Sequence, residues 1–156
     1  MKRMTVREIN MNVRLYTDSF PEEARQIREK VFIKEQGFQS EFDELDAKAA
    51  HIVAFDDDGL PMATCRVFFS EEQNSYVIGR LAVRKECRGK RVGEAAVREA
   101  ERYILHNHCH RAVLHAQCRV QPFYEKLGFN AYGIPDEDEG CAHIWMKKEL
   151  EQSTVI

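Results

Sequence analysis

The sequence of 156 residues predicts a mixed α/β fold in which helices flank a central, mostly antiparallel sheet with one parallel crossover. Two apolar, β-branched segments flank the turn residues Asp56–Pro61, which is the pattern of a hairpin. Farther along the chain, a strand pattern, a long helical pattern and another strand pattern follow one another, and such a unit joins parallel strands by a right-handed crossover. This combination excludes a simple doubly wound parallel sheet.

The N-terminal part should contain one strand and one helix. Met11–Thr17 alternates apolar and polar residues and predicts the first strand. Ser19–Glu22 has the spacing of a capping box, so a helix should begin there. Apolar residues then recur at helical spacing at Phe20, Ala24, Ile27 and Val31. Residues 37–50 are polar and acidic, and they predict a loop or a short helix.

The middle of the chain supplies three successive strands. His51–Phe55 and Met62–Phe69 form the two arms of the predicted hairpin. A second turn at Glu71–Ser75 leads into the strand Tyr76–Val83.

The C-terminal part alternates helices and strands. A helix is predicted from Val92 to about Asn107, a strand over Val113–Ala116 and a short helix over Phe123–Phe129. Gly133–Gly140 predicts an irregular acidic loop, and His143–Lys148 predicts the last strand. The expected order is therefore strand, helix, three strands, helix, strand, helix and strand.

Length and composition describe one globular domain, since 44% of the residues are hydrophobic and 31% are charged. We assign residues 1–10 to a flexible lead-in, 11–150 to the domain and 151–156 to a C-terminal tail. The net charge of −3 gives no general attraction to nucleic acid. No segment approaches the ~18 apolar residues of a membrane span, and the N-terminus lacks an apolar signal core. We therefore expect a cytoplasmic protein without a membrane or nucleic-acid partner.

The most informative segment is the basic turn Arg88–Gly93, which joins an apolar strand directly to the long helix. The start of a helix carries unpaired backbone N–H groups and a partial positive charge. Glycines let the backbone close around an anion, while arginine and lysine add positive charge. The turn therefore predicts a phosphate-binding loop, although it has neither the Walker A spacing nor Gly-x-Gly-x-x-Gly.

Two motifs resemble those of the GNAT superfamily of N-acetyltransferases. Arg88–Gly93 resembles its coenzyme A pyrophosphate loop, Arg/Gln-x-x-Gly-x-Gly/Ala, with Arg91 in place of the middle glycine. Phe123–Phe129 resembles its aromatic-Tyr-x-x-x-Gly-Phe helix. The N-terminal third is similar to the ElaA/YjcF-like branch, so the resemblance covers roughly residues 11–150. It implies the GNAT acyl-CoA N-acyltransferase fold and transfer of an acetyl group from acetyl-CoA, the co-substrate, to a primary amine of a small molecule.

The resemblance also implies where the cofactor binds. The strand before the loop is bulged in this family, so backbone N–H groups of Leu81, Ala82 and Val83 can polarise the acetyl carbonyl. The pyrophosphate is expected at Arg88, Gly89, Lys90, Arg91, Val92, Gly93 and Glu94. Gln117, Phe123 and Tyr124 are expected beside the pantetheine arm.

Two side chains are candidates for proton transfer. His143 matches a histidine that acts as general base in some relatives, because an amine must lose a proton before it attacks a thioester. Tyr124 would donate to the departing thiolate. The alternatives for His143 are a strand histidine that faces solvent or packs on Trp145. The alternatives for Tyr124 are a hydroxyl that only hydrogen-bonds the sulfur and a core aromatic residue with its hydroxyl at the surface.

The acceptor site is less well specified. Arg28 and Arg80 could clamp an anionic group of the acceptor, and Glu35 could line the same pocket. The alternative is that these arginines form ion pairs with nearby acids. Asp136–Glu139 and Asp43–Asp46 favour a cationic amine instead, so the charge of the acceptor stays open.

Two rival hypotheses use the same loop. A catalytically silent module that binds acyl-CoA would keep the loop but release no thiol in the presence of amines. A nucleotide-phosphate enzyme would need a carboxylate for Mg²⁺ after a strand end, and the sequence offers none at such a place. No Cys-x-x-Cys occurs, so we expect no metal, and a homodimer is left open.

Overall fold

The computed structural model describes residues 10–39 and 41–151. Its elements, in chain order, are β1 Met11–Tyr16, α1 Glu22–Arg28, the π-helical η2 Glu29–Glu35, the 3-10 helix η3 Glu44–Ala47, β2 Ala50–Asp56, β3 Pro61–Ser70, β4 Ser75–Val83, the 3-10 helix η4 Lys85–Cys87, α2 Val92–His106, β5 Arg111–Gln117, the 3-10 helix η5 Cys118–Val120, α3 Gln121–Lys126, β6 Asn130–Asp138 and β7 Cys141–Glu149.

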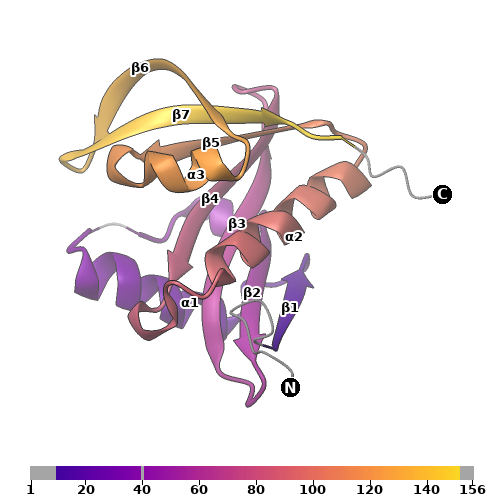
Figure 1. Cartoon of the computed structure of the whole chain (residues 1–156), viewed down its shortest axis with the longest axis vertical. Coiled ribbons are helices and arrows are strands. Elements are labelled where there is room, and N and C mark those ends of the chain that lie inside the picture. Colours follow the sequence, from indigo (N-terminus) through magenta and orange to yellow (C-terminus); the bar gives the residue numbers. More distant parts are fainter. Residues whose placement is uncertain (1–9, 40, 152–156) are drawn as a thin grey trace, which may run out of the picture.

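The strands form one seven-stranded sheet in the order β1-β2-β3-β4-β5-β7-β6 (Figure 1). All neighbours are antiparallel except β4 and β5, which are parallel and joined through α2. The predicted fold class, a mostly antiparallel mixed sheet with one parallel crossover, is confirmed.

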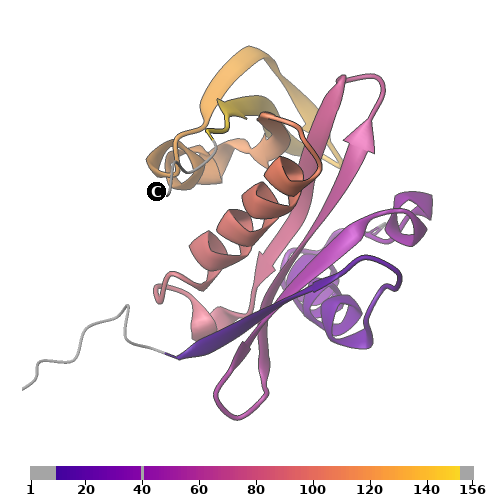
Figure 2. The same ribbon diagram turned by 90° about the vertical axis from the view of Figure 1, so that its right-hand side faces the viewer.

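Helices cover both faces of the sheet, and strand alternation explains which residues they bury. In β2, Ile52 belongs to the core under α2, whereas the next residue, Val53, belongs to the core under α1. Figure 2 shows α1 and α2 on opposite sides of the sheet. We call these the α1 face and the α2 face; α3 also packs on the α2 face, through Tyr124 and Leu127.

The parallel strands β4 and β5 pair only near their first residues, at Tyr76 with Ala112 and Val77 with Val113. The two strands therefore separate toward their C-terminal ends. Where two parallel strands diverge, the backbone N–H and C=O groups of one strand can no longer form hydrogen bonds with those of the other. This separation opens the sheet beside the start of α2.

A β-bulge lies in β4 immediately before the predicted phosphate loop. Between two pairs with β3, Gly79–Arg66 and Ala82–Thr64, β4 contains one residue more than β3. The bulge reverses the side-chain alternation, because Ile78 packs on the α2 face whereas Ala82 packs on the α1 face. Arg80 takes the left-handed conformation at φ +53°, which is uncommon for a residue with a Cβ.

The first helix does not end at Arg28 but widens into the π-helical η2, where the Gln36 N–H donates to the Val31 carbonyl five residues earlier. Phe32 on this segment packs in the α1-face core, while Glu35 and Gln36 extend toward the diverging strands. Single π-helical turns are rare and occur often at functional sites.

Three expectations need correction or fall outside the description. The segment expected to be an irregular acidic loop is most of β6, an edge strand paired with β7, and its irregularity is a register shift between Tyr132 and Asp136. The sequence of β6 shows no alternation of apolar and polar residues, because the strand is almost wholly exposed on both faces. The predicted capping box is wrong, since α1 has Pro21 at its N-cap and no side-chain cap. Residues 1–9 of the expected lead-in lie outside the described residues.

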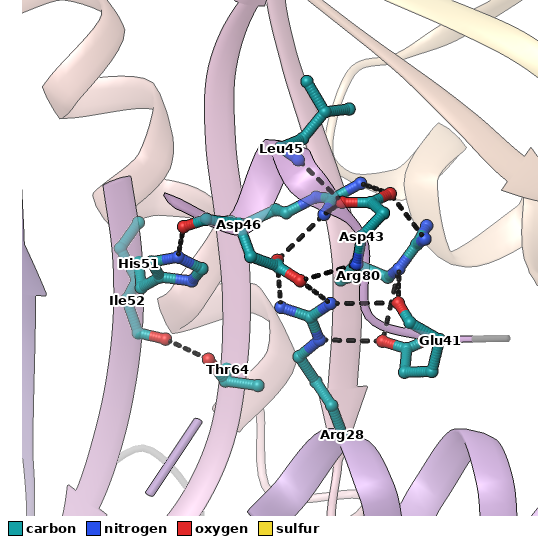
Figure 3. Close-up of polar contacts among 10 residues, drawn as sticks. Arg28, Glu41, Asp43, Leu45, Asp46, His51, Ile52, Thr64 and Arg80 are labelled. Carbon is teal, nitrogen blue, oxygen red and sulfur yellow. Dashed lines mark hydrogen bonds and ion pairs between the residues drawn. The ribbon is translucent and has the colours of Figure 1, made fainter. Parts of the chain in front are cut away.

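A buried network of charges ties α1 to the segment before β2 (Figure 3). Its three arginines and three carboxylates are Arg28, Arg66, Arg80, Glu41, Asp43 and Asp46. Arg28, 1% exposed, donates from Nε to Glu41 Oε2 at 2.7 Å and from Nη1 to Asp46 Oδ1 at 2.7 Å. Its charge is thus fully engaged inside the protein.

The rest of the network reaches the central strands. Arg66 of β3 donates from Nη1 to Asp43 Oδ1 at 2.7 Å and to Asp46 Oδ1 at 2.9 Å. Arg80, at the bulge, donates from Nε to the Glu41 carbonyl at 3.0 Å and from Nη2 to Asp43 Oδ2 at 3.3 Å. The bulge and residues 41–46 are therefore held together.

We predict that Asp46 makes stability depend on pH in the acidic range. Burial alone would raise the pKa of Asp46, but hydrogen bonds from Arg28 and Arg66 outweigh it and lower the pKa to about 2, from 3.8. Ionised Asp46 therefore stabilises the fold above about pH 4 by on the order of 2 kcal/mol, and this contribution is lost as the pH falls to about 2.

Asp46→Asn should lower the free energy of unfolding at neutral pH by about 3 kcal/mol, because two buried arginines lose a counter-charge. The difference from wild type should shrink toward pH 2. Thermal unfolding followed by circular dichroism measures it, with Asp58→Asn in the exposed turn as a control. A variant that keeps the wild-type dependence on acid would contradict this assignment.

Candidate functional site

A cleft of about 930 Å³ lies where β4 and β5 separate. Its floor consists of the ends of the two strands, Ile78–Leu81 and Leu114–Gln117. On the α2 face it is lined by the loop before α2 and by α3; on the α1 face it is lined by η2, the residues after it and the β6–β7 hairpin. The cleft is therefore open to both faces of the sheet.

The predicted phosphate loop forms one end of the cleft, which we call the cofactor end. Arg91 is the N-cap of α2 and has φ +64° and ψ +20°, a left-handed conformation normally taken by glycine. The arginine that replaces the middle glycine of the motif thus keeps a glycine-like backbone. Gly93 permits close packing, since an added Cβ would lie 3.3 Å from Val83 Cγ2 and 3.4 Å from Phe123 Cζ.

Of the residues predicted for this loop, six line the cleft and one does not. Arg88, Gly89, Arg91, Val92, Gly93 and Glu94 contribute to its surface, whereas Lys90 is exposed outside it. Gly89 has φ +82°, a conformation that its lack of a side chain makes easy. The cleft is also lined by two cations that sequence reasoning missed, Arg119 and Lys126.

Arg88 is held by Glu35 of η2, a residue that the sequence suggested for the acceptor site. Its Nη1 and Nη2 donate to the two carboxylate oxygens of Glu35 at 2.7 and 2.9 Å, and its Nε donates to the Val83 carbonyl at 3.0 Å. The hydrogen bonds from Arg88 lower the pKa of Glu35. A bidentate carboxylate occupies the geometry that a phosphate would use.

Of the backbone groups predicted to polarise a carbonyl, Leu81 and Val83 line the cleft. Ala82 does not, because the bulge turns its side chain into the core under α1. A bulge re-aims backbone groups that would otherwise point along the sheet. The expected bulge is therefore present next to the expected site.

Tyr124, on α3, is 8% exposed and lines the cleft from the α2 face. Its hydroxyl has no hydrogen-bond partner among residues 10–39 and 41–151. Burial raises the pKa of Tyr124 well above its ordinary value, so the hydroxyl stays protonated. Phe123 stands beside it with ring centroids 5.0 Å apart and also lines the cleft.

His143, on β7, is 7% exposed and lines the cleft from the α1 face, since its neighbour Ile144 points into the core under α2. Its Nδ1 lies 2.8 Å from the Cys141 carbonyl oxygen. A carbonyl only accepts, so Nδ1 carries the hydrogen and Nε2 keeps a free lone pair. Within the described chain, Nε2 has no hydrogen-bond partner.

Sequence reasoning missed His115 of β5. Its ring stacks on His143 with centroids 4.8 Å apart, and its Nε2 lies 2.8 Å from Asp136 Oδ1. His115, Asp138 and His143 each place one possible metal-ligand atom within 4.8 Å of the others. Alternation along β5 could have revealed His115, because its neighbours Leu114 and Ala116 are core residues.

Gln117 lies in the cleft as predicted, and its Nε2 donates to Gln36 Oε1 at 3.0 Å. Arg28 does not reach the cleft, because Glu41 and Asp46 bind it in the interior. For Arg28 the alternative interpretation, an ion pair with nearby acids, is therefore the one that the structure shows. Arg80 lines the cleft, but its guanidinium is shared with Glu41 and Asp43.

Comparison with known proteins identifies the family. Residues 16–150 match the acetyltransferase (GNAT) domain. The chain belongs to this family. ElaA of Escherichia coli is 32% identical over 133 residues, which cover 82% of this chain and 86% of ElaA. YjcF of Bacillus subtilis, an uncharacterized N-acetyltransferase, is 29% identical over 126 residues, or 79% of this chain and 88% of YjcF. The expected ElaA/YjcF-like branch is confirmed.

Solved structures support the same conclusion about this GNAT fold. The crystal structure of Escherichia coli ElaA has a TM-score of 0.77 at 26% identity and covers 90% of this chain and all, 100%, of that one. An acyl-CoA N-acyltransferase from Pseudomonas aeruginosa has a TM-score of 0.70 at 27% identity, covering 90% and 99%. In the described part of the chain, no helix has the length and apolar character needed to cross a membrane.

We predict that Arg91→Gly leaves stability unchanged or raises it by up to about 1 kcal/mol, because glycine takes the left-handed conformation without strain. Lys90→Gly is the matched control. Lys90 has no positive φ, so glycine there should lower stability by up to about 1 kcal/mol through the entropy of the unfolded chain. Urea unfolding of both variants tests this, and equal losses would contradict the assigned strain.

Proposed function

We propose that the protein transfers an acetyl group from acetyl-CoA to the primary amine of a small molecule, by direct attack in a ternary complex. One observation carries the proposal: Tyr124 and His143 line opposite walls of one cleft, and within the described residues neither the Tyr124 hydroxyl nor His143 Nε2 takes part in a hydrogen bond. Both side chains are almost buried, at 8% and 7% exposed, so a ligand in the cleft would meet two polar groups that the protein leaves available.

The cofactor would enter from the α2 face. Its pyrophosphate would lie at the start of α2, on the backbone N–H groups and beside the cations at the cofactor end. Arg88 would exchange the Glu35 carboxylate for phosphate oxygens. The pantetheine arm would occupy the gap between β4 and β5, where backbone groups of both strands lack each other as partners.

The acceptor would enter from the α1 face, where His143 lies. As the amine nitrogen bonds to the acetyl carbon, the nitrogen becomes positively charged and gives a proton to His143 Nε2. A backbone N–H near Leu81 would stabilise the oxyanion. The carbon–sulfur bond then breaks, and its electron pair leaves with the sulfur as a thiolate.

Tyr124 would stabilise that thiolate by a hydrogen bond. Because burial raises the pKa of Tyr124, transfer of its proton to the departing thiolate, whose thiol has an ordinary pKa near ~8.5, is unfavourable. A hydrogen bond to the developing charge requires no such transfer. We therefore propose that Tyr124 acts as a hydrogen-bond donor to the thiolate and not as a general acid.

Release of free thiol tests the proposal against the alternative of a silent acyl-CoA-binding module. Both should show a higher melting temperature with acetyl-CoA, since a ligand of the native state stabilises it. Only the enzyme should release thiol when acetyl-CoA and an amine are present together. Binding without release from any primary amine would favour the silent module.

Tyr124→Phe should lower kcat by about tenfold, equivalent to ~1.4 kcal/mol of barrier, with little effect on the stabilisation by acetyl-CoA. The hydroxyl acts only as negative charge develops on sulfur. Thiol release at saturating acetyl-CoA measures the change, and Tyr132→Phe on β6, outside the cleft, is the control. Wild-type turnover in Tyr124→Phe would remove this residue from the mechanism.

His143→Gln should lower kcat by on the order of 100-fold, because the ammonium formed on attack loses its proton acceptor. Raising the pH should restore part of the rate in the variant, since a larger fraction of the free amine is then unprotonated. Rates of thiol release measured over a range of pH with the same amine compare the wild type with the variant. If His143→Gln retained the wild-type rate throughout, water or another group would carry the proton.

A further inference from the structure

The charges that line the cleft are divided between its two ends. Resting on the proposed acetyl transfer, we infer that the acceptor is a dicationic amine: a small molecule with a second positive charge a few bonds from the amine that is acetylated. The second charge is recognised by the β6–β7 hairpin, with Asp138 as the principal residue. The sequence alone left open whether the acceptor is anionic or cationic.

The buried arginines on the α1 face are not available to an anionic acceptor. The three arginines that could bind it, Arg28, Arg66 and Arg80, are matched one for one by three carboxylates. Burial raises the pKa of Glu41, and the charges of Arg80 and Arg28 oppose this rise. The network contains as many arginines as carboxylates, and its guanidinium groups are already bound to these carboxylates, although the buried Arg66 Nε has no hydrogen-bond partner among the described residues.

Among residues 10–39 and 41–151, the carboxylates of Asp136–Glu139 in the β6–β7 hairpin form no ion pair with a lysine or arginine, and that of Asp136 binds only a histidine. Asp136 pairs with His143 across the two strands and binds His115, so its side chain points to the α1 face. Asp138 lies two residues farther on and therefore on the same face. Among the described residues, Asp138 makes no hydrogen bond or ion pair, and its carboxylate lies within 4.8 Å of ring nitrogens of His115 and His143. In the described part of the chain, Glu139 accepts one hydrogen bond, from the Gln39 N–H at 3.1 Å.

Most of the other cations of the cleft lie near the start of α2 and on α3. Arg91 lines the cleft there together with Glu94, Lys126 extends from α3, and Arg88 is paired with Glu35, near which Arg119 also lies. A polyphosphate is thus attracted to one end of the cleft and a polycation to the other. Such separation favours the correct placement of each substrate and disfavours the reverse.

The α1-face wall of the cleft also offers apolar surface to a short aliphatic spacer. Phe32 and Phe38 line the cleft on the α1 face, with ring centroids 6.3 Å apart. Methylene groups of an alkyl diamine would lose contact with water against these rings. The reacting amine would lie at His143, and the distal ammonium would lie at Asp138.

Three acceptors with the same reacting amine test the inference. 1,4-Diaminobutane, n-butylamine and 4-aminobutyrate share a four-carbon chain and differ only in the charge of the far end. In thiol-release assays containing EDTA, kcat/KM should fall in that order, with on the order of tenfold between the first two at low salt. The preference should weaken as salt is added, because Asp138 is exposed.

Asp138→Asn should reduce kcat/KM for the diamine more than for butylamine and so shrink their ratio by several-fold. Glu137→Gln is the matched control, since it removes the same charge from the opposite face of β6. Equal use of diamine and butylamine, or preference for 4-aminobutyrate, would overturn the inference while leaving acetyl transfer intact. An unchanged ratio in Asp138→Asn would overturn the role of Asp138. Thiol release with none of the three amines would overturn the proposed function as well.

Discussion

The brief pairing between β4 and β5 is the constraint on which the candidate site depends. Two residue pairs hold the parallel strands together, and beyond them the sheet opens. An opening in the middle of a sheet is costly unless a ligand satisfies the exposed backbone. Here it is kept open by elements on both faces, with α2 and α3 on one side and η2 on the other (Figures 1 and 2).

The buried charge network explains how the α1-face wall keeps its shape. Residues 41–46 contain only one turn of 3-10 helix and little apolar surface of their own. Their carboxylates are instead fixed by arginines from α1, β3 and the β4 bulge. Because the bulged residue Arg80 is part of this network, the unusual backbone before the loop Arg88–Gly93 and the α1-face wall of the cleft are stabilised by the same contacts.

Much of the fold could be predicted from sequence, because local patterns determine it. The hairpin, the crossover and the phosphate loop follow from turn residues, periodicity and the glycines near Arg88. The part of the cleft formed by Arg88–Glu94 was predictable for the same reason, since these residues are contiguous in sequence. His115 and Arg28 were not, because their roles depend on pairing across the sheet and on which charges meet in the interior. The strand β6 was missed because an exposed edge strand needs no apolar alternation.

The exposed position of β6 has a consequence for assembly. An edge strand offers unpaired backbone groups to any other strand, and proteins commonly protect such edges with charge. The run Asp136–Glu139 places carboxylates along and beside this edge. Two copies brought together edge to edge about a two-fold axis would oppose these like charges. The residues that give the cleft its negative end therefore also disfavour extension of the sheet into a second molecule.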